Sequence, residues 1–141
     1  MADKLKISKA AAERLNFLST RLNLKRNVIC RIAISISLAE ETPVTTSLET
    51  DTEGYEFNKS TLYGPDELIF RSVGSYVQGE PAGPDFFNIV IRNHLERGLE
   101  LMEARYEAVN SPVGYLSHFV MDFTEEPEMK RLKGTRQSKL L

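Results

Sequence analysis

The chain has 141 residues and a formal net charge of −2, with 41% hydrophobic and 27% charged residues. This length allows one domain with a substantial core, and the composition is that of an ordinary globular protein. Cys30 is the single cysteine, so an intrachain disulfide is excluded and we expect a cytoplasmic location.

Positive and negative charges are segregated along the chain. Residues 1–38 hold eight basic and two acidic residues, whereas residues 39–70 hold eight acidic residues and one basic residue. Residues 71–128 hold ten acids and four bases, and the last thirteen residues hold five bases and no acid. The basic N-terminal segment is therefore a candidate anion-binding surface, and nucleic acid is the commonest large anion.

The N-terminal segment begins with a predicted strand and a predicted helix. Residues Lys4–Ser8 alternate polar and apolar side chains, the period of a short half-buried strand. Ser8 can cap a helix over Lys9–Leu22, in which an apolar stripe starts at Ala11 and continues at i+4, i+7 and i+11. Asn23 tolerates a left-handed backbone and is expected to end this helix.

A second helix, from about Arg26 to Ala39, is apolar on almost every side. Its apolar run is too short to cross a bilayer, so we expect no membrane partner. A helix that is hydrophobic all round is buried on all sides. In a protein of this size such burial often needs a second subunit, so we expect a homo-oligomer, either a dimer or a tetramer. The residues expected to hold the core or the subunits together are Val28, Ile29, Ile32 and Ile36.

The remaining pattern predicts a loop and further helices. Residues 40–58 form an acidic, Thr-rich loop with a strand near Tyr55–Phe57. A helix is expected from Pro65 to about Val77, and a long helix from Asp85 to about Val109. The predicted fold is thus a single, mainly α domain over residues 1–128, with a basic strand-helix-helix segment at 1–39 and two or more further helices. A flexible basic tail is predicted over residues 129–141.

A short strand followed by two helices is the order of the ribbon-helix-helix module, in which strands from two subunits pair and enter the major groove. If Leu5 and Ile7 face the core, Lys4, Lys6 and Ser8 face outward. Lysines act as point charges and read sequence poorly, which favours binding to backbone phosphates. Lys25 and Arg26 open the second helix, where free backbone N–H groups also favour phosphate.

His94 is the candidate catalytic residue of the long helix. It could act as a general base or contact phosphate, although a lone histidine beside apolar residues is more often a hydrogen-bonded core group. Gly98, one turn later, could permit close helix packing. His118 has no metal-ligand spacing to His94 or Cys30, so we expect no metal. The sequence has no glycine-rich phosphate loop, no G-x-S-x-G and no paired-cysteine motif, so we expect no cofactor and no enzymatic activity.

Two blocks carry a resemblance to a known family. The run AAERLNFLSTRLNLKRNVICRIAISISL at residues 11–38 and the run RNHLERGLELM at residues 92–102 resemble DndE, the small subunit of the bacterial DNA phosphorothioation (Dnd) system. The resemblance implies a ribbon-helix-helix-like DNA-binding protein that acts where a non-bridging phosphate oxygen of DNA is replaced by sulfur. The implied partners are double-stranded DNA and the other proteins of that system. The matching basic positions are Arg14, Arg21, Lys25, Arg26, Arg31, Arg92 and Arg97, while Lys4, Lys6 and Lys9 follow from charge and alternation alone.

The function expected from the sequence is that of a DNA-binding accessory subunit in DNA phosphorothioation. It would bind duplex DNA through backbone phosphates with little sequence specificity, and nicked duplex is a candidate substrate. Two alternatives stay open at this point. One is a DNA-nicking endonuclease that uses His94, and the other is a transcriptional repressor of ribbon-helix-helix type.

Overall fold

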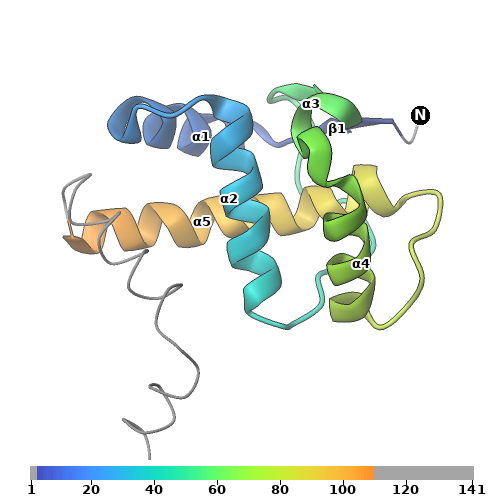
Figure 1. The fold of residues 1–141 in the computed structure, drawn as a ribbon. Helices are drawn as coiled ribbons and strands as arrows, with labels where there is room; N and C mark the ends of the chain where they lie inside the picture. The colour runs from blue at the N-terminus through green and yellow to red at the C-terminus, as the bar shows by residue number, and fades with distance from the viewer. Residues whose placement is uncertain (1–2, 110–141) are drawn as a thin grey trace, which may run out of the picture. The chain divides into compact units, whose positions relative to one another are not determined.

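The computed structural model describes residues 3–109, which are mainly helical with a small two-stranded sheet (Figure 1). In chain order the elements are β1 (Lys4–Lys6), α1 (Lys9–Leu22), α2 (Arg26–Ala39), β2 (Glu56–Asn58), α3 (Lys59–Tyr63), the 3-10 helix η1 (Gly64–Asp66), α4 (Glu67–Gln78), the π-helix η2 (Phe86–Ile91) and α5 (Arg92–Val109). The expected domain end at residue 128 and the basic tail lie outside the described residues. No helix within residues 3–109 is both long and apolar enough to cross a membrane.

The first two helices confirm the sequence prediction, including their ends. The hydroxyl oxygen of Ser8 accepts the backbone N–H of Ala11 at 3.0 Å, which caps the first turn of α1. Asn23 ends α1 in the left-handed conformation, with φ of 57°. Local signals were sufficient here because caps and periodicity act within a few residues of the chain.

The strand β1 pairs with β2 of the same chain. The two strands are antiparallel, with Leu5 opposite Phe57 and Lys6 opposite Glu56. In the ribbon-helix-helix module the first strand pairs with a second subunit, so the order of elements matches that module whereas the pairing differs. At the other edge of β1 the Arg92 side chain donates from Nε to the carbonyl oxygen of Lys6 at 3.1 Å.

The second half of the structure departs from the prediction in two places. The short helix α3 was missed, because five residues are too few to show a helical period. The expected helix over 85–109 begins with the π-helix η2, whose wider turns bury Phe86, Phe87, Val90 and Ile91 together. A period of 3.6 residues does not predict such turns.

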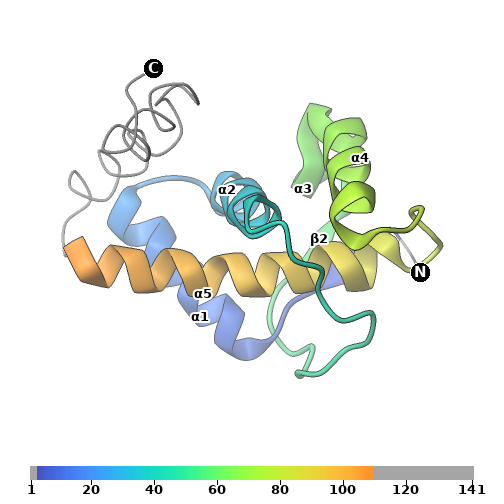
Figure 2. The same ribbon diagram turned by 90° about the horizontal axis from the view of Figure 1, so that it is seen from below.

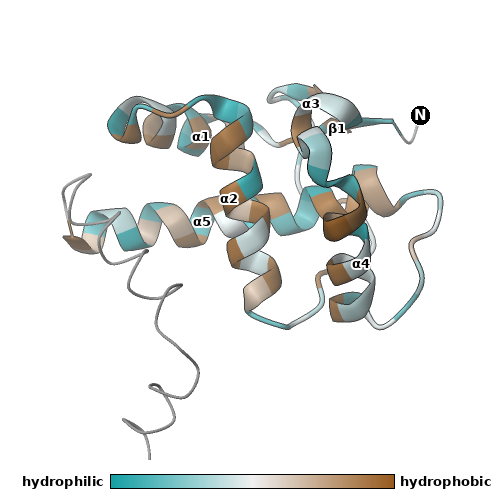
Figure 3. Ribbon diagram, in the orientation of Figure 1, coloured by the Kyte–Doolittle hydropathy of each residue, from teal (hydrophilic) through white to brown (hydrophobic). Residues whose placement is uncertain are grey.

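The centre of the fold is the crossing of α2 over α5 (Figures 1 and 2). Gly98 of α5 lies directly against the backbone of Ala33, and a Cβ atom at Gly98 would overlap the Ala33 carbonyl. Figure 3 shows hydrophobic residues along α2, α4 and α5, and Ile29, Phe70 and Leu95 are among those that are buried.

The apolar character of α2 is explained largely within one chain. Residues of α1, α3 and α4 contact α2, and Ile29 and Ile36 are buried among these neighbours. Cys30 is also buried, as expected for a core cysteine, and burial raises its pKa to about 12. Val28 and Ile32 keep partial exposure. The burial of α2 therefore does not require a second subunit. The homo-oligomer stays a prediction.

Candidate nucleic-acid interface

Six of the ten cations singled out from the sequence have exposed side chains and lie in two groups. The strand group, at β1 and the start of α1, is made up of Lys4, Lys6 and Lys9. The corner group, where α1 ends and α2 begins, is made up of Arg21, Lys25 and Arg26. At 1.5 Å per helical residue, α1 separates Lys9 from Arg21 by about 18 Å.

The arginines of the corner group rest on aromatic rings. The guanidinium carbon of Arg21 lies 4.8 Å from the centre of the Phe17 ring, and that of Arg26 lies 4.6 Å from the centre of the Tyr55 ring. Asn16 accepts hydrogen bonds from Arg26 Nε at 3.0 Å and from the Tyr55 hydroxyl at 2.9 Å. Stacking and the Asn16 contact restrain these planar donors and lower the entropy lost when they bind an anion.

The strand group borders a surface hollow of about 360 Å³. Lys4 and Lys6 line it, together with the carboxylate of Glu56 on the neighbouring strand. The backbone N–H groups of Glu53 and Lys9 hydrogen-bond the Asp51 carboxylate and lower its pKa. The strand group therefore carries a positive charge that nearby carboxylates partly offset. The corner group forms no ion pair with an acidic residue of the described range 3–109.

Two other arginines from the sequence prediction are occupied within the fold. Arg14 forms ion pairs with Glu103 at 3.1 Å and with Glu100 at 3.8 Å. Arg31 donates to the carbonyl oxygens of Leu62 at 2.8 Å and Thr61 at 3.0 Å, near the end of α3. Both side chains connect α1 or α2 to other elements.

Arg92 and Arg97 connect α5 to the loop over residues 40–55. Arg92 is 1% exposed and donates to the carbonyl oxygens of Lys6 and Asp51, at 3.1 and 2.7 Å. Arg97 donates to the carbonyl oxygens of Ser37 and Thr42, at 3.0 and 2.7 Å. Their donors are directed to backbone carbonyls of the same chain. Arg92 and Arg97 are therefore not part of the proposed DNA-binding surface.

His94 is fully buried in the described structure. Arg97 Nε donates to the Ser37 hydroxyl oxygen at 2.8 Å, which leaves the Ser37 proton to donate to His94 Nδ1, also at 2.8 Å. This arrangement places the imidazole proton on Nε2, which has no hydrogen-bond partner among residues 3–109. Burial, with the charge of Arg97, lowers the pKa of His94 to about 4. His94 is thus the neutral, hydrogen-bonded core histidine.

The comparisons with known proteins extend the resemblance across all the described elements. A family model described as DNA sulphur modification protein DndE matches residues 4–110. The chain belongs to the DndE family. The match supports a role in DNA sulphur modification for this DndE family member, and it includes β1 and the acidic loop as well as the two blocks recognised in the sequence.

A solved relative supports the fold of this DndE family member. The crystal structure of DndE from Escherichia coli B7A, involved in DNA phosphorothioation modification, is 16% identical in sequence and superposes with a TM-score of 0.60. The superposition covers 69% of this chain and 94% of that one. A search of curated proteins found no match.

Sequence reasoning missed what the RNHLERG block does. Asn93 Nδ2 donates to the carbonyl oxygens of Thr45 and Ser47, at 2.9 and 3.0 Å. Glu96 accepts both the backbone N–H and the hydroxyl of Ser8, at 2.7 and 2.8 Å. With Arg92 and Arg97, these side chains attach β1, the start of α1 and the acidic loop to α5. The sequence did contain a signal for these contacts, because polar residues that cluster on the inner side of a core helix need partners within the fold.

Proposed function

We propose that this protein is a DNA-binding accessory subunit of DNA phosphorothioation that contacts the backbone phosphates of duplex DNA. The observation that carries the proposal is the pair of exposed cation groups at the two ends of α1, in a chain of the DndE family. Charged donors that contact phosphates and not the edges of bases bind DNA without reading its sequence.

The spacing of the two groups matches contact with the backbone of one duplex over several base pairs. At 3.4 Å per base pair, 18 Å corresponds to about five base pairs along the helix axis. Exchange of a backbone oxygen requires access to the phosphodiester. We infer from this requirement that the subunit prefers nicked duplex.

Fluorescence anisotropy on nicked and intact duplexes of one sequence, titrated across salt, tests the proposal. If all six cations contact phosphate, log K should fall against log salt with a slope of about −5. Nicked duplex should bind more tightly than intact duplex. The double variant Lys4→Ala/Lys6→Ala should reduce the magnitude of the slope by about 2 and weaken binding to all sequences alike.

Arg71→Ala is the matched control, because Arg71 is an exposed arginine of α4 outside both groups and forms only a 3.9 Å ion pair with Glu67. It should leave the salt slope unchanged. Binding that is insensitive to salt, or equally reduced by Arg71→Ala, would contradict the assignment of the surface. Equal affinity for nicked and intact duplex would contradict the preference for nicks alone.

Two observations on the described residues favour this proposal over the two alternatives. A nicking reaction at His94 requires a substrate to reach an imidazole that is 0% exposed. A repressor of ribbon-helix-helix type requires β1 to pair with a second subunit, whereas β1 pairs with β2. Other proteins of the phosphorothioation system, and further copies of this chain, remain part of the proposal as partners.

A further inference from the structure

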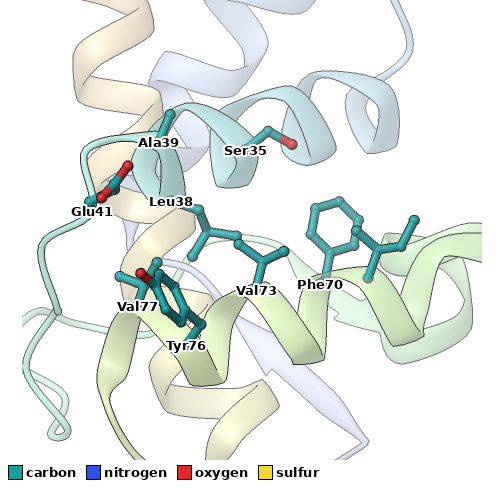
Figure 4. A pocket seen from close by; sticks show the side chains of 9 residues that line it. Ser35, Leu38, Ala39, Glu41, Phe70, Val73, Tyr76 and Val77 are labelled. Atoms are coloured by element: carbon teal, nitrogen blue, oxygen red, sulfur yellow. The ribbon is translucent and has the colours of Figure 1, made fainter.

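An apolar groove lies between α2 and α4 (Figure 4). It encloses about 330 Å³ and, apart from Ser35 and Glu41 at its edge, is lined by hydrocarbon and aromatic side chains. Leu38 of α2 and Phe70 and Val73 of α4 point into the space between the two helices. None of the six exposed cations lines the groove.

On the α4 side of this groove, large apolar side chains are exposed to solvent. Ile69 is 60% exposed, Val73 is 41% exposed and Tyr76 is 79% exposed. The adjacent Leu68 is 75% exposed. Single exposed apolar residues are ordinary, but a contiguous group along one helix marks an interaction surface. The patch extends over two helical turns, or about 10 Å from Ile69 to Tyr76.

Two carboxylates stand at one end of the groove, which is unusual for the C-terminus of a helix. Glu40 and Glu41 follow the last residue of α2, where the partial negative charge of the helix makes carboxylates unfavourable. Glu41 also has φ of 57°, a left-handed conformation that non-glycine residues rarely adopt. Arg97 interacts with the charge of Glu40. No side chain among residues 3–109 forms an ion pair or hydrogen bond with the Glu41 carboxylate.

We propose that the α2–α4 groove binds an amphipathic α-helix of another protein. This helix would insert apolar side chains at positions i, i+3 or i+4, and i+7 between α2 and α4. A lysine or arginine beyond the last anchor would pair with Glu41. The two-turn length of the exposed patch fits these three anchors, and the unpaired carboxylate at its end determines the charge of the partner.

A second copy of this chain fits the groove less well. In a two-fold contact centred on the groove, the residues that line the groove meet those of the second copy. Glu41 is the one charged residue that lines the groove. Self-pairing through this face would therefore leave Glu41 without a cation.

The test uses the whole protein and a fluorescein-labelled helical peptide with leucines at i, i+3, i+4 and i+7 followed by two lysines. A peptide with two glutamates in place of the lysines, and one with the leucine positions shuffled, serve as probes of charge and spacing. Anisotropy should show saturable binding of the lysine peptide, with at least about tenfold weaker binding of the other two.

Two variants locate the binding site. Tyr76→Glu places a charge on the exposed edge of the groove and should weaken the lysine peptide by about tenfold or more, whereas Leu48→Glu, at another exposed apolar residue, should not. Glu41→Lys should reverse the preference in favour of the glutamate peptide. Glu49→Lys makes the same charge change at an exposed loop residue outside the groove and should keep the original preference.

Separate outcomes distinguish this proposal from the DNA-binding proposal. Tyr76→Glu and Glu41→Lys, neither of which lies in the hollow that Lys4 and Lys6 line, should retain salt-dependent DNA binding. A failure of peptide binding in these variants would therefore not arise from loss of the cation groups. No saturable peptide binding, or binding unaffected by Tyr76→Glu, would overturn the inference. It would also be overturned if sedimentation velocity showed that Tyr76→Glu converts an oligomer into a monomer, because a second copy would then occupy the groove.

Discussion

Arg92 shows how one side chain can connect segments that are distant in the sequence. Its guanidinium binds a carbonyl of β1 and a carbonyl of the acidic loop, and Nη2 lies 3.5 Å from the Glu96 carboxylate. Such a buried charge is tolerated because its donors are satisfied and an acid is nearby. Its place in the RNHLERG block therefore follows from the fold and does not require contact with DNA.

Arg92→Lys should lower the free energy of unfolding by about 3 kcal/mol, because a lysine keeps the charge but cannot reach both carbonyls at once. Chemical denaturation at neutral pH measures this loss. Arg71→Lys, which changes an exposed arginine, should alter stability by less than about 0.5 kcal/mol. Unchanged stability of Arg92→Lys together with a smaller salt slope for DNA binding would return Arg92 to the DNA surface.

His94 makes stability depend on pH. Its pKa is about 4 in the folded chain and 6.5 in an ordinary environment, so the unfolded chain binds a proton more readily. The stability that the neutral imidazole provides is complete above pH 6.5 and is lost as the pH falls toward 4. Protonation would also place a second charge beside Arg97.

The free energy of unfolding should therefore decrease by up to about 3 kcal/mol between pH 7 and pH 4 through His94 alone. Urea denaturation across this range measures the slope. His94→Gln should be less stable at pH 7 but should lose this part of the pH dependence. His118→Gln is the control with the same loss of one histidine, and removal of the slope by that change would contradict the assignment.

At the scale of elements, the crossing of α2 and α5 depends on Gly98. The Ala33 backbone occupies the space where a side chain would begin. Because the obstacle is a backbone carbonyl, it cannot move as a flexible side chain would. The sequence indicated this close packing from a glycine on the inner side of a long helix, although it could not identify α2 as the partner.

Gly98→Ala should destabilise the protein by about 1–3 kcal/mol, because the two helices must separate to admit one methyl group. Thermal unfolding followed by circular dichroism measures the effect. Gly83→Ala is the matched control, since a Cβ there meets no atom within 4 Å. If the two variants melt at the same temperature, the close contact between α2 and α5 does not limit stability.

The elements that could be predicted from the sequence are those whose determinants are local. Ser8 and Asn23 define the ends of α1 through contacts within a few residues, and the apolar period defines its buried face. The π-helical turns of η2 could not be predicted, because they follow from the burial of adjacent apolar side chains against distant elements.

The same distinction applies to the candidate site. Lys4 and Lys6 were predicted correctly as exposed, because strand alternation is local. The same alternation was wrong for Ser8, which is buried because its backbone N–H and its hydroxyl donate to Glu96. Arg92 was not predicted as buried, because its partner at Lys6 lies 86 residues earlier in the chain. Charge counts identify candidate cations, but only tertiary contacts show which of them remain free to bind a ligand.

At the scale of the whole molecule, the two ends of α2 carry side chains of opposite charge. Lys25 and Arg26 stand at its N-terminus, and Glu40 and Glu41 follow its C-terminus. Both arrangements oppose the helix dipole, so each end is electrostatically unfavourable without a ligand. A phosphate at the first end and a basic partner at the second would each relieve this. The proposed DNA surface and the proposed protein groove are thus about 20 Å apart on one rigid element.

The environment of β1 also affects how the protein behaves at high concentration. Exposed strand edges recruit strands of other molecules and lead to aggregation. Here β2 pairs with one edge of β1. At the other edge the Arg92 side chain donates a hydrogen bond to the Lys6 carbonyl oxygen. The exposed side chains of the strand are lysines. Strand exchange between molecules would first have to displace a buried arginine, so the strand that could begin a fibril is protected by the same contact that organises the fold.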